Sequence, residues 1–333
     1  MKILLRFIIG LVLALGLLYA FGPKPEPLDI SPDANAIMDP TDFNPNYVVK
    51  AVRNGEQELQ IRKGNESQLY WADSVGAKTK FVLLYLHGFS ASPEEGSPIH
   101  LDVAKKYGMN MYAPLLSDHG LVEDEPMLNF TAERFVATAK HALRLARLMG
   151  DSVILMSTST GGTASIFLAS GNNEIHSQIC YSPNIQIADA KASMLTGPFG
   201  LGIARKVKGG NYNEWEAPKG AEDYWHLKYR LEALVELQRL VEGTMKKETF
   251  EKVTVPTYLG YYYKNEEEQD DVVSVAAMLD MYDNLGSANK MKVALPDVGV
   301  HALANKYFSK DLESVRESTF EFVQEKLGLQ PVN

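Results

Sequence analysis

Short unbroken apolar runs recur along most of the chain, and stretches with helical spacing lie between them. The strand-like runs cover residues 81–86, 109–112, 153–156, 175–181, 253–262 and 292–295. The helix-like stretches cover residues 98–107, 131–149, 163–169 and 309–326. Apolar runs without polar alternation are typical of strands that are covered on both faces. The pattern therefore predicts an α/β fold with a mainly parallel sheet and helices on both of its faces.

The region before this alternation contains shorter strand patterns. They cover residues 47–52, 58–61 and 68–71. Asn54-Gly55 and Gly64-Asn65 separate them, and both pairs are turn signals. We therefore expect the domain to open with an antiparallel hairpin.

Residues 185–250 interrupt the alternation, because they lack a strand pattern. Residues 225–241 place Leu227, Leu231 and Leu234 on one helical stripe. We expect a mostly helical insertion here, forming a cap above the sheet. The core then consists of a first part at residues 47–184 and a second part at residues 251–330.

The N-terminal 22 residues differ from the rest of the chain. Lys2 and Arg6 precede an apolar run over residues 7–21 that has no polar face. Such a segment is typical of a membrane anchor or of a secretory signal. An uncleaved anchor is favoured because Pro23 would follow the small-residue cleavage site; secretion after signal cleavage stays the alternative. The positive charges place the catalytic domain on the extracytoplasmic side of the membrane.

Residues 23–46 hold six prolines, at positions 23, 25, 27, 32, 40 and 45. Proline has a fixed φ angle and no N–H donor, so this composition favours an extended linker over a packed element.

Charge and cysteine content exclude several classes of protein. Acidic residues outnumber basic ones, 42 to 33, and the net charge is −9. Nucleic-acid binding requires a basic surface, so a nucleic-acid partner is not expected. Cys180 is the only cysteine, which excludes an intramolecular disulfide and a cysteine-based zinc site. It lies in the strand-like run 175–181 and is expected to be buried.

The most informative stretch joins the strand-like run 153–156 to a predicted helix through Ser157-Thr158-Ser159-Thr160-Gly161. A strand that turns sharply into a helix lifts the middle side chain into an exposed, strained position. The stretch resembles the nucleophile elbow G-x-S-x-G of the α/β hydrolases, with Ser157 in place of the first glycine. The resemblance makes Ser159 the candidate nucleophile. Taken alone, S-x-S-x-G also fits a helix start without chemistry.

Further motifs of the chain resemble those of the α/β hydrolases in their order and spacing. His87-Gly88-Phe89 ends the run 81–86 and resembles the family's oxyanion loop, which implies Phe89 N–H and Thr160 N–H as oxyanion donors. Pro114 to Gly120 resembles a loop in which His119 is structural, with Asp118 in place of a common glycine. His87 is also expected to be structural.

The base and the acid are expected late in the chain. His301 is the histidine that follows a late strand-like run by a short loop, so it is the candidate base. Asp270-Asp271-Val272-Val273 follows the preceding strand and resembles the family pattern D-x-V-V. This resemblance assigns the acid to Asp270, with Asp271 or a nearby glutamate as the fallback. The order Ser, Asp, His matches the α/β hydrolases.

The resemblance covers residues 47–327 and is nearest to the branch of monoglyceride lipases, carboxylesterases and serine aminopeptidases, which carry a helical cap. It implies a serine hydrolase that cleaves carboxylic esters through an acyl-enzyme on Ser159 and needs no metal or organic cofactor. The cap residues Met194, Leu195, Phe199 and Leu201 favour a lipid-like ester, although they would also serve to pack the cap. The alternatives are a serine aminopeptidase or amidase, or a non-catalytic binding protein of this fold at the membrane surface.

Overall fold

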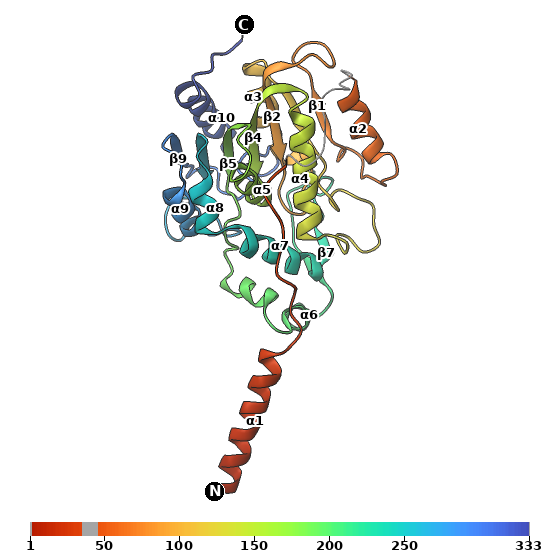
Figure 1. Ribbon diagram of the computed structural model, residues 1–333, viewed down its shortest axis with the longest axis vertical. Helices are drawn as coiled ribbons and strands as arrows, with labels where there is room; N and C mark the ends of the chain where they lie inside the picture. Colours follow the sequence, from red (N-terminus) through yellow and green to blue (C-terminus); the bar gives the residue numbers. More distant parts are fainter. Residues whose placement is uncertain (1, 35–45, 333) are drawn as a thin grey trace.

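The computed structural model describes residues 2–34 and 46–332, and its centre is a seven-stranded sheet (Figure 1). The strand order is β1-β3-β2-β4-β5-β8-β9. Every neighbouring pair is parallel except β1 and β3, which are antiparallel. The strands are β1 (Gln68–Tyr70), β2 (Thr79–Leu86), β3 (Asn110–Ala113), β4 (Gly150–Thr158), β5 (Ile175–Tyr181), β8 (Thr257–Tyr261) and β9 (Lys290–Ala294). The predicted mainly parallel α/β fold is confirmed.

Helices cover both faces of the sheet, as the unbroken apolar strands require. Alternate residues of β2 enter different cores: Leu84 and Leu86 pack on one face, and Leu83 and Tyr85 on the other. The first face is covered by α4 (Ala132–Ala146), α5 (Thr160–Ala169), α8 (Lys247–Lys252) and α9 (Val275–Asn284). The second face is covered by α3 (Ile99–Lys106) and α10 (Leu312–Glu321). Cys180 is fully buried, as expected.

The predicted opening hairpin is wrong. Residues 47–56 form helix α2 (Tyr47–Glu56), and its valines Val48 and Val52 are buried in the core one helical turn apart. The two β-branched residues that favoured a strand therefore serve equally well as one face of a helix. Residues 58–61 form only an isolated bridge, from Ile61 to Leu121, and β1 pairs with β3 instead.

The cap contains more strand than the sequence predicts. Its helical elements are η3 (Ala190–Thr196), α6 (Gly200–Lys208) and α7 (Leu231–Thr244). Strands β6 (Tyr212–Glu214) and β7 (Lys228–Arg230) form an antiparallel pair, and the helix expected from residue 225 begins at Leu231. Strands of three residues are too short to show a period of two, so the pattern gave no sign of them.

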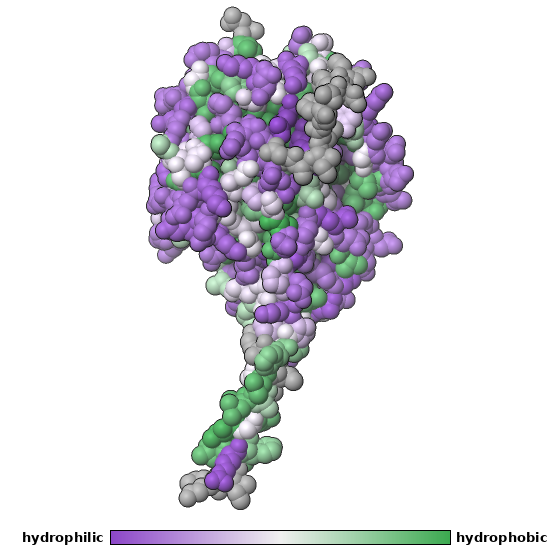
Figure 2. All heavy atoms as spheres, viewed as in Figure 1, coloured by the Kyte–Doolittle hydropathy of each residue, from purple (hydrophilic) through white to green (hydrophobic). Residues whose placement is uncertain are grey.

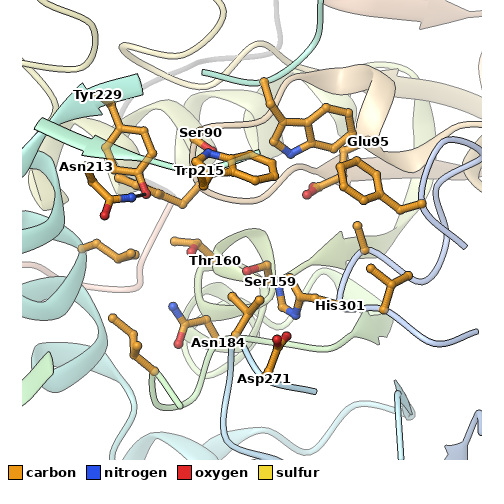
Figure 3. A pocket seen from close by; sticks show the side chains of 18 of the residues that line it. Ser90, Glu95, Ser159, Thr160, Asn184, Asn213, Trp215, Tyr229, Asp271 and His301 are labelled. Carbon is orange, nitrogen blue, oxygen red and sulfur yellow. Dashed lines mark hydrogen bonds between the residues drawn. The ribbon is translucent and has the colours of Figure 1, made fainter. Parts of the chain in front are cut away.

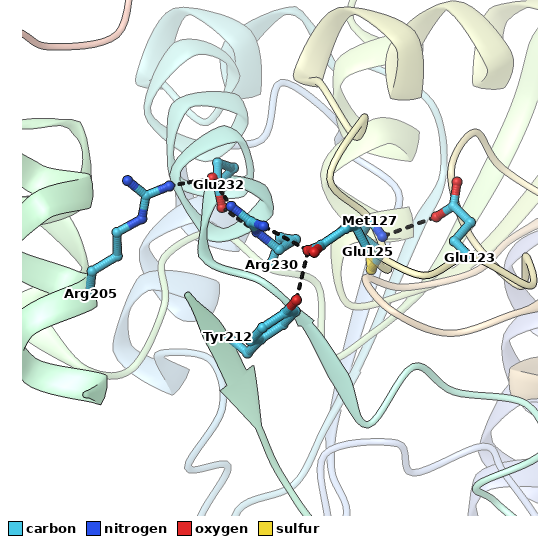
Figure 4. Close-up of polar contacts among 7 residues, drawn as sticks. All are labelled: Glu123, Glu125, Met127, Arg205, Tyr212, Arg230 and Glu232. Atoms are coloured by element: carbon cyan, nitrogen blue, oxygen red, sulfur yellow. Dashed lines mark hydrogen bonds and ion pairs between the residues drawn. The ribbon is translucent and has the colours of Figure 1, made fainter. Parts of the chain in front are cut away.

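A polar cluster around Arg230 fastens the cap to the core (Figure 4). Its guanidinium donates to Glu125, on the core loop before α4, at 2.6 Å, and to Glu232 at 2.6 Å. The Tyr212 hydroxyl also donates to Glu125, at 2.7 Å. The backbone N–H of Arg230 donates to Pro126 O at 3.0 Å. Residues from both cap strands are therefore held against one core loop.

The N-terminal helix α1 (Lys2–Ala20) projects away from the folded domain (Figure 1). Its apolar side chains are largely exposed, for example Phe7 at 69% and Leu13 at 62%, and they form the apolar stalk in Figure 2. Within the described residues, no helix meets the combined length and hydropathy expected of a membrane-crossing segment.

The proline-rich segment after α1 is extended and packs against the folded domain. Leu28 and Ile30 pack against the core, and Asn172 binds Pro32 O and Ala34 N–H at 2.8 and 2.9 Å. The linker expected at residues 23–46 is therefore, up to residue 34, a strap laid along the domain. Its remainder, residues 35–45, lies outside the described residues.

Candidate active site

Ser159 occupies the turn between β4 and α5, and its backbone is held at φ 54° and ψ −121°. A non-glycine residue with positive φ is uncommon and is strained unless its surroundings enforce it. Gly161 permits the turn to lie close to the sheet, because a Cβ at this position would overlap the backbone carbonyl of Leu86 at the end of β2. Ser157, which replaces the first glycine of the motif, is fully buried and its hydroxyl donates to Ile179 O at 3.4 Å. A serine is therefore accommodated there.

The start of α5 lies next to the nucleophile. The carbonyl of Ser159 accepts from Gly162 N–H at 2.8 Å and from Asn184 N–H at 2.9 Å, which fixes the turn. Thr160 is the first residue of α5, so its N–H has no acceptor within the helix. Such a free N–H at a helix N-terminus favours negative charge. The role of Thr160 as an oxyanion donor stays a prediction.

His301 and Asp270 form a buried pair, as the late-chain motifs predict. His301 Nδ1 lies 2.8 Å from Asp270 Oδ2. The other carboxylate oxygen accepts from Val272 N–H at 3.0 Å and from Val273 N–H at 3.1 Å. These bonds fix the carboxylate, which in turn fixes the imidazole with its Nδ1 protonated and Nε2 available.

Ser159 and His301 lie next to each other in one pocket (Figure 3). His301 Nε2 is buried and has no hydrogen-bond partner among the described residues. In the part of the chain that the structure describes, no hydrogen bond therefore joins His301 Nε2 to Ser159. Contacts between a nucleophile and its base are often long without substrate and shorten when substrate binds. The structure thus brings residues 159, 270 and 301 together from three distant parts of the chain.

The charges of the pair stabilise each other. Burial lowers the pKa of His301, but the Asp270 carboxylate, with smaller contributions from Glu95 and Asp271, outweighs burial and holds the pKa above 6.5. Burial would raise the pKa of Asp270, but His301 and the backbone N–H of Val273 lower it overall. Asp270 therefore stays ionised while His301 gains and loses its proton.

The loop after β2 is fixed by His87. Leu116 N–H donates to His87 Nε2 at 3.0 Å, so the protonated Nδ1 donates to Gly88 O at 2.9 Å. His119 is fully buried and packs edge-on against both His87 and Phe89. Both histidines therefore support the loop, as expected. Phe89 lines the pocket, and its role as an oxyanion donor stays a prediction.

Asp118 explains the family's preference for glycine at its position. Its φ is 64°, a conformation that glycine adopts without strain. In this chain the side chain instead forms a two-pronged ion pair with Arg134, at 2.9 and 3.0 Å. That pair gives the strained residue a compensating contact.

The pocket has a volume of about 640 Å³ and lies between the sheet and the cap. The cap residues that line it are mainly aromatic and leucine side chains: Trp215, Trp225, Tyr229, Leu234 and Leu237. The four cap residues expected to favour an acyl chain are absent from this lining, so they give no support to an acyl-chain substrate. Met194 and Phe199 are instead exposed, at 46% and 38%.

Sequence reasoning missed two polar residues of the pocket, Glu95 and Asn184. Glu95 is only 3% exposed, and burial raises its pKa to about 7. It lies in a short turn, η2 (Pro93–Gly96), whose composition is that of an ordinary surface loop. No local pattern could have shown its burial. In the described part of the chain, no group of three or more His, Cys, Asp or Glu side chains is arranged to hold a metal ion.

Comparison with known proteins supports the fold. No protein-family model and no curated protein sequence matches the chain. Solved structures do match. A structure described under LipS and LipT, two metagenome-derived lipolytic enzymes, has a TM-score of 0.65 at 17% identity, covering 80% of this chain and 100% of that one. A thermostable carboxyl esterase from Bacillus coagulans has a TM-score of 0.58 at 13% identity, covering 79% and 94%.

A monoacylglycerol lipase from Paleococcus ferrophilus has a TM-score of 0.57 at 11% identity, covering 78% of this chain and 98% of that one. At these identities the likeness shows the fold alone. The chain therefore has the α/β-hydrolase fold.

The close approach at Gly161 predicts a large stability difference between two glycine substitutions. Gly161→Ala should lower the free energy of unfolding by about 3 kcal/mol, because the added Cβ overlaps fixed backbone. Gly202→Ala, in helix α6, meets no atom within 4 Å and should raise it by about 0.5 kcal/mol. Denaturant unfolding measures both. Equal stability of the two variants would contradict this account of the turn.

The His301–Asp270 pair predicts the acid limb of the pH profile. A base is inactive when protonated, so kcat/KM for a neutral ester should fall as pH drops through a midpoint above 6.5. Asp270→Asn removes the main stabiliser of the imidazolium and leaves only the smaller contributions of Glu95 and Asp271 against burial, so the midpoint should move to lower pH. The rate should also fall about 10⁴-fold.

The matched variant for this experiment is Asp271→Asn. The Asp271 carboxylate raises the pKa of His301 without bonding to it, so this substitution should move the midpoint less than Asp270→Asn does. A larger shift for position 271 than for position 270 would mean that Asp271 orients the base.

Proposed function

We propose that the protein is a serine hydrolase that cleaves carboxylic esters, a carboxylesterase or monoacylglycerol-lipase-like enzyme. The observation that carries this proposal is a strained serine, held at φ 54°, that shares a pocket with a histidine bonded to a buried carboxylate. Strain of this kind persists only where the surrounding structure enforces it, and it is common at catalytic sites.

The proposed mechanism uses only residues of this chain. His301 Nε2 takes the proton of the Ser159 hydroxyl, which attacks the ester carbonyl. The N–H groups of Phe89 and Thr160 receive the developing oxyanion, and such donors are typically worth about 3 kcal/mol of barrier. His301 then protonates the leaving alcohol. Water, activated by the same base, releases the acid from Ser159, while Asp270 keeps the imidazole in the required tautomer.

The solved structures that match the fold favour ester hydrolysis over amide hydrolysis. The matching structures are described as lipolytic enzymes, a carboxyl esterase and a monoacylglycerol lipase. A serine aminopeptidase or amidase of the same fold is the alternative reaction, because the same three side chains would serve it. A non-catalytic binding protein is the alternative without a reaction; the strained Ser159 turn argues against it.

Active-site labelling tests the proposal. A fluorophosphonate probe should label the wild-type protein, and Ser159→Ala should abolish labelling because it removes the only atom proposed to attack. Ser157→Ala, two residues away, is the control and should still be labelled. Nitrophenyl esters of increasing chain length should be hydrolysed faster than aminoacyl anilides. A wild-type protein that the probe leaves unlabelled would support a binding protein, and faster turnover of anilides would support the aminopeptidase.

We also propose that helix α1 holds the catalytic domain at a lipid bilayer, on the extracytoplasmic side. The exposed apolar side chains of α1 support this. Exposing so many apolar side chains of one helix to water is energetically unfavourable. Lys2 and Arg6, before most of the apolar residues, support the orientation.

Two substitutions on α1 test the membrane proposal. Leu11→Asp combined with Leu13→Asp should move the protein from the membrane fraction to the supernatant in fractionated cells, because both side chains are exposed on α1. Val75→Asp, at an equally exposed apolar residue of the folded domain, should not. Recovery of the wild-type protein in the supernatant would overturn the proposal.

A further inference from the structure

The pocket around Ser159 is lined by negative charge. Among the described residues, three carboxylates line it, those of Glu95, Glu216 and Asp271, and no lysine or arginine does. His301 is the one basic side chain in this described lining, and its charge is matched by Asp270. A cleft lined by one sign of charge concentrates ions of the opposite sign.

Glu95 is the deepest of these carboxylates. Its Oε2 accepts from Gly88 N–H at 2.6 Å and from the Tyr85 hydroxyl at 3.1 Å. The turn that carries it is held by the side chain of Asn305, which donates to Glu94 O and Glu95 O at 3.0 and 3.1 Å. The carboxyl group is therefore rigidly placed, as a recognition group must be.

The second oxygen of Glu95 remains free for a ligand. A Cβ added at Gly88 would come within 3.0 Å of Glu95 Oε1 and within 3.0 Å of Ser159 Cβ. The carboxylate and the nucleophile thus flank the same glycine. Figure 3 shows the Glu95 carboxyl directed into the pocket across from Ser159, with Asp271 on the other side. A substrate bonded to Ser159 would pass between the two carboxylates.

Asn184 also indicates an absent ligand. It is 3% exposed and lines the pocket, and its side-chain oxygen has no hydrogen-bond partner among the described residues. Buried polar atoms are nearly always paired, so an unpaired oxygen in a pocket indicates a position where a ligand or water completes the site. This oxygen adds partial negative charge beside the three carboxylates.

Aromatic rings form much of the remaining lining. They belong to Phe89, Trp215, Trp225, Tyr229 and Phe308. The faces of aromatic rings carry partial negative charge and attract cations, most strongly when the cation is shielded from water. Carboxylates and aromatic faces together are a combination that recognises a large, weakly hydrated cation.

We propose that this pocket selects esters whose alcohol part carries a positive charge, and that Glu95 and Asp271 are the specificity-determining residues. The inference rests on the proposed ester hydrolysis and names its substrate class. In the Michaelis complex the cation lies between the two carboxylates and the aromatic rings, and the ester carbonyl meets Ser159. After acyl transfer the cationic alcohol departs with the proton from His301.

The charge of Glu95 makes this selectivity depend on pH. Burial raises the pKa of Glu95 to about 7, so the carboxyl group is neutral below that pH and anionic above it. The titratable groups that face it are Tyr85 on β2 and His301 after β9. Tyr85 stays protonated because its pKa is raised, mainly by burial. His301 must be neutral for either a charged or a neutral ester to react, so its titration cancels from a ratio of the two.

Two esters that differ only in charge test the proposal. Butyrylcholine carries a quaternary ammonium at every pH, and 3,3-dimethylbutyl butyrate is its neutral carbon counterpart. The wild-type protein should show a kcat/KM for butyrylcholine about tenfold higher than for the neutral ester at pH 8 and low salt. This ratio should fall with added salt, and it should fall as pH is lowered through about 7.

Substitutions then assign the effect to residues. Glu95→Gln keeps the size and an acceptor for Gly88 N–H, so it should lower the ratio and remove its dependence on pH. Asp271→Asn should lower the ratio and keep that dependence. Glu267→Gln, which removes the same charge from an exposed position outside the pocket, should change neither.

The outcomes separate this inference from the function on which it rests. Equal turnover of the two butyrates, or a faster neutral ester, would overturn the cationic substrate and leave ester hydrolysis standing. Turnover of nitrophenyl esters with neither butyrate accepted would overturn it as well. No turnover of any ester by wild-type protein would reject the proposed function itself.

Discussion

The site depends on one close approach, that of the first turn of α5 to the end of β2. Gly161 lies against the Leu86 carbonyl with no room for a side chain, and Ser159, two residues earlier, is held at φ 54°. Because β2 continues directly into His87-Gly88-Phe89, the same contact brings the Ser159 turn close to the start of that loop. The central strands, buried on both faces, make this junction rigid.

Around that junction, two carboxyl groups are given different charges by different surroundings. Asp270 is bonded to His301 and to two backbone N–H groups, and its pKa is lowered overall despite burial. Glu95 is equally buried but has one backbone N–H and a hydroxyl, and its pKa is raised to about 7. Burial raises the pKa of both groups, and for Asp270 the adjacent His301, with the backbone N–H of Val273, outweighs it. One carboxylate therefore stays ionised beside the imidazole while the other responds to pH.

The cap completes the site from the other side. Its strands β6 and β7 are fastened to the core loop at Glu125 through Tyr212 and Arg230, and the neighbouring Trp215 and Tyr229 face the pocket. The polar cluster and two of the aromatic side chains that line the pocket thus come from the same two short strands or the residue next to them. The cap therefore contributes one wall of the pocket, and the core contributes Ser159 and His301.

Patterns within the sequence were enough for the parallel strands, for the Ser159 turn and for the place of His301 after a late strand, because buried strands lack polar alternation and a sharp turn needs small residues. The fold class could be predicted for the same reason. The choice of Asp270 over Asp271 rested on the resemblance to the α/β hydrolases, and the structure pairs Asp270 with His301.

Other features were decided only by tertiary structure. Val48 and Val52 fit a strand or a helix equally well, and only the core against which they pack selects the helix. Glu95 lies in a turn of surface-like composition, and its surroundings include Tyr85 and Gly88 on the preceding strand and loop and Asn305, which lies 210 residues away in the chain. The charge of a buried group depends on the groups that surround it in space. The order of residues along the chain does not show which groups those are.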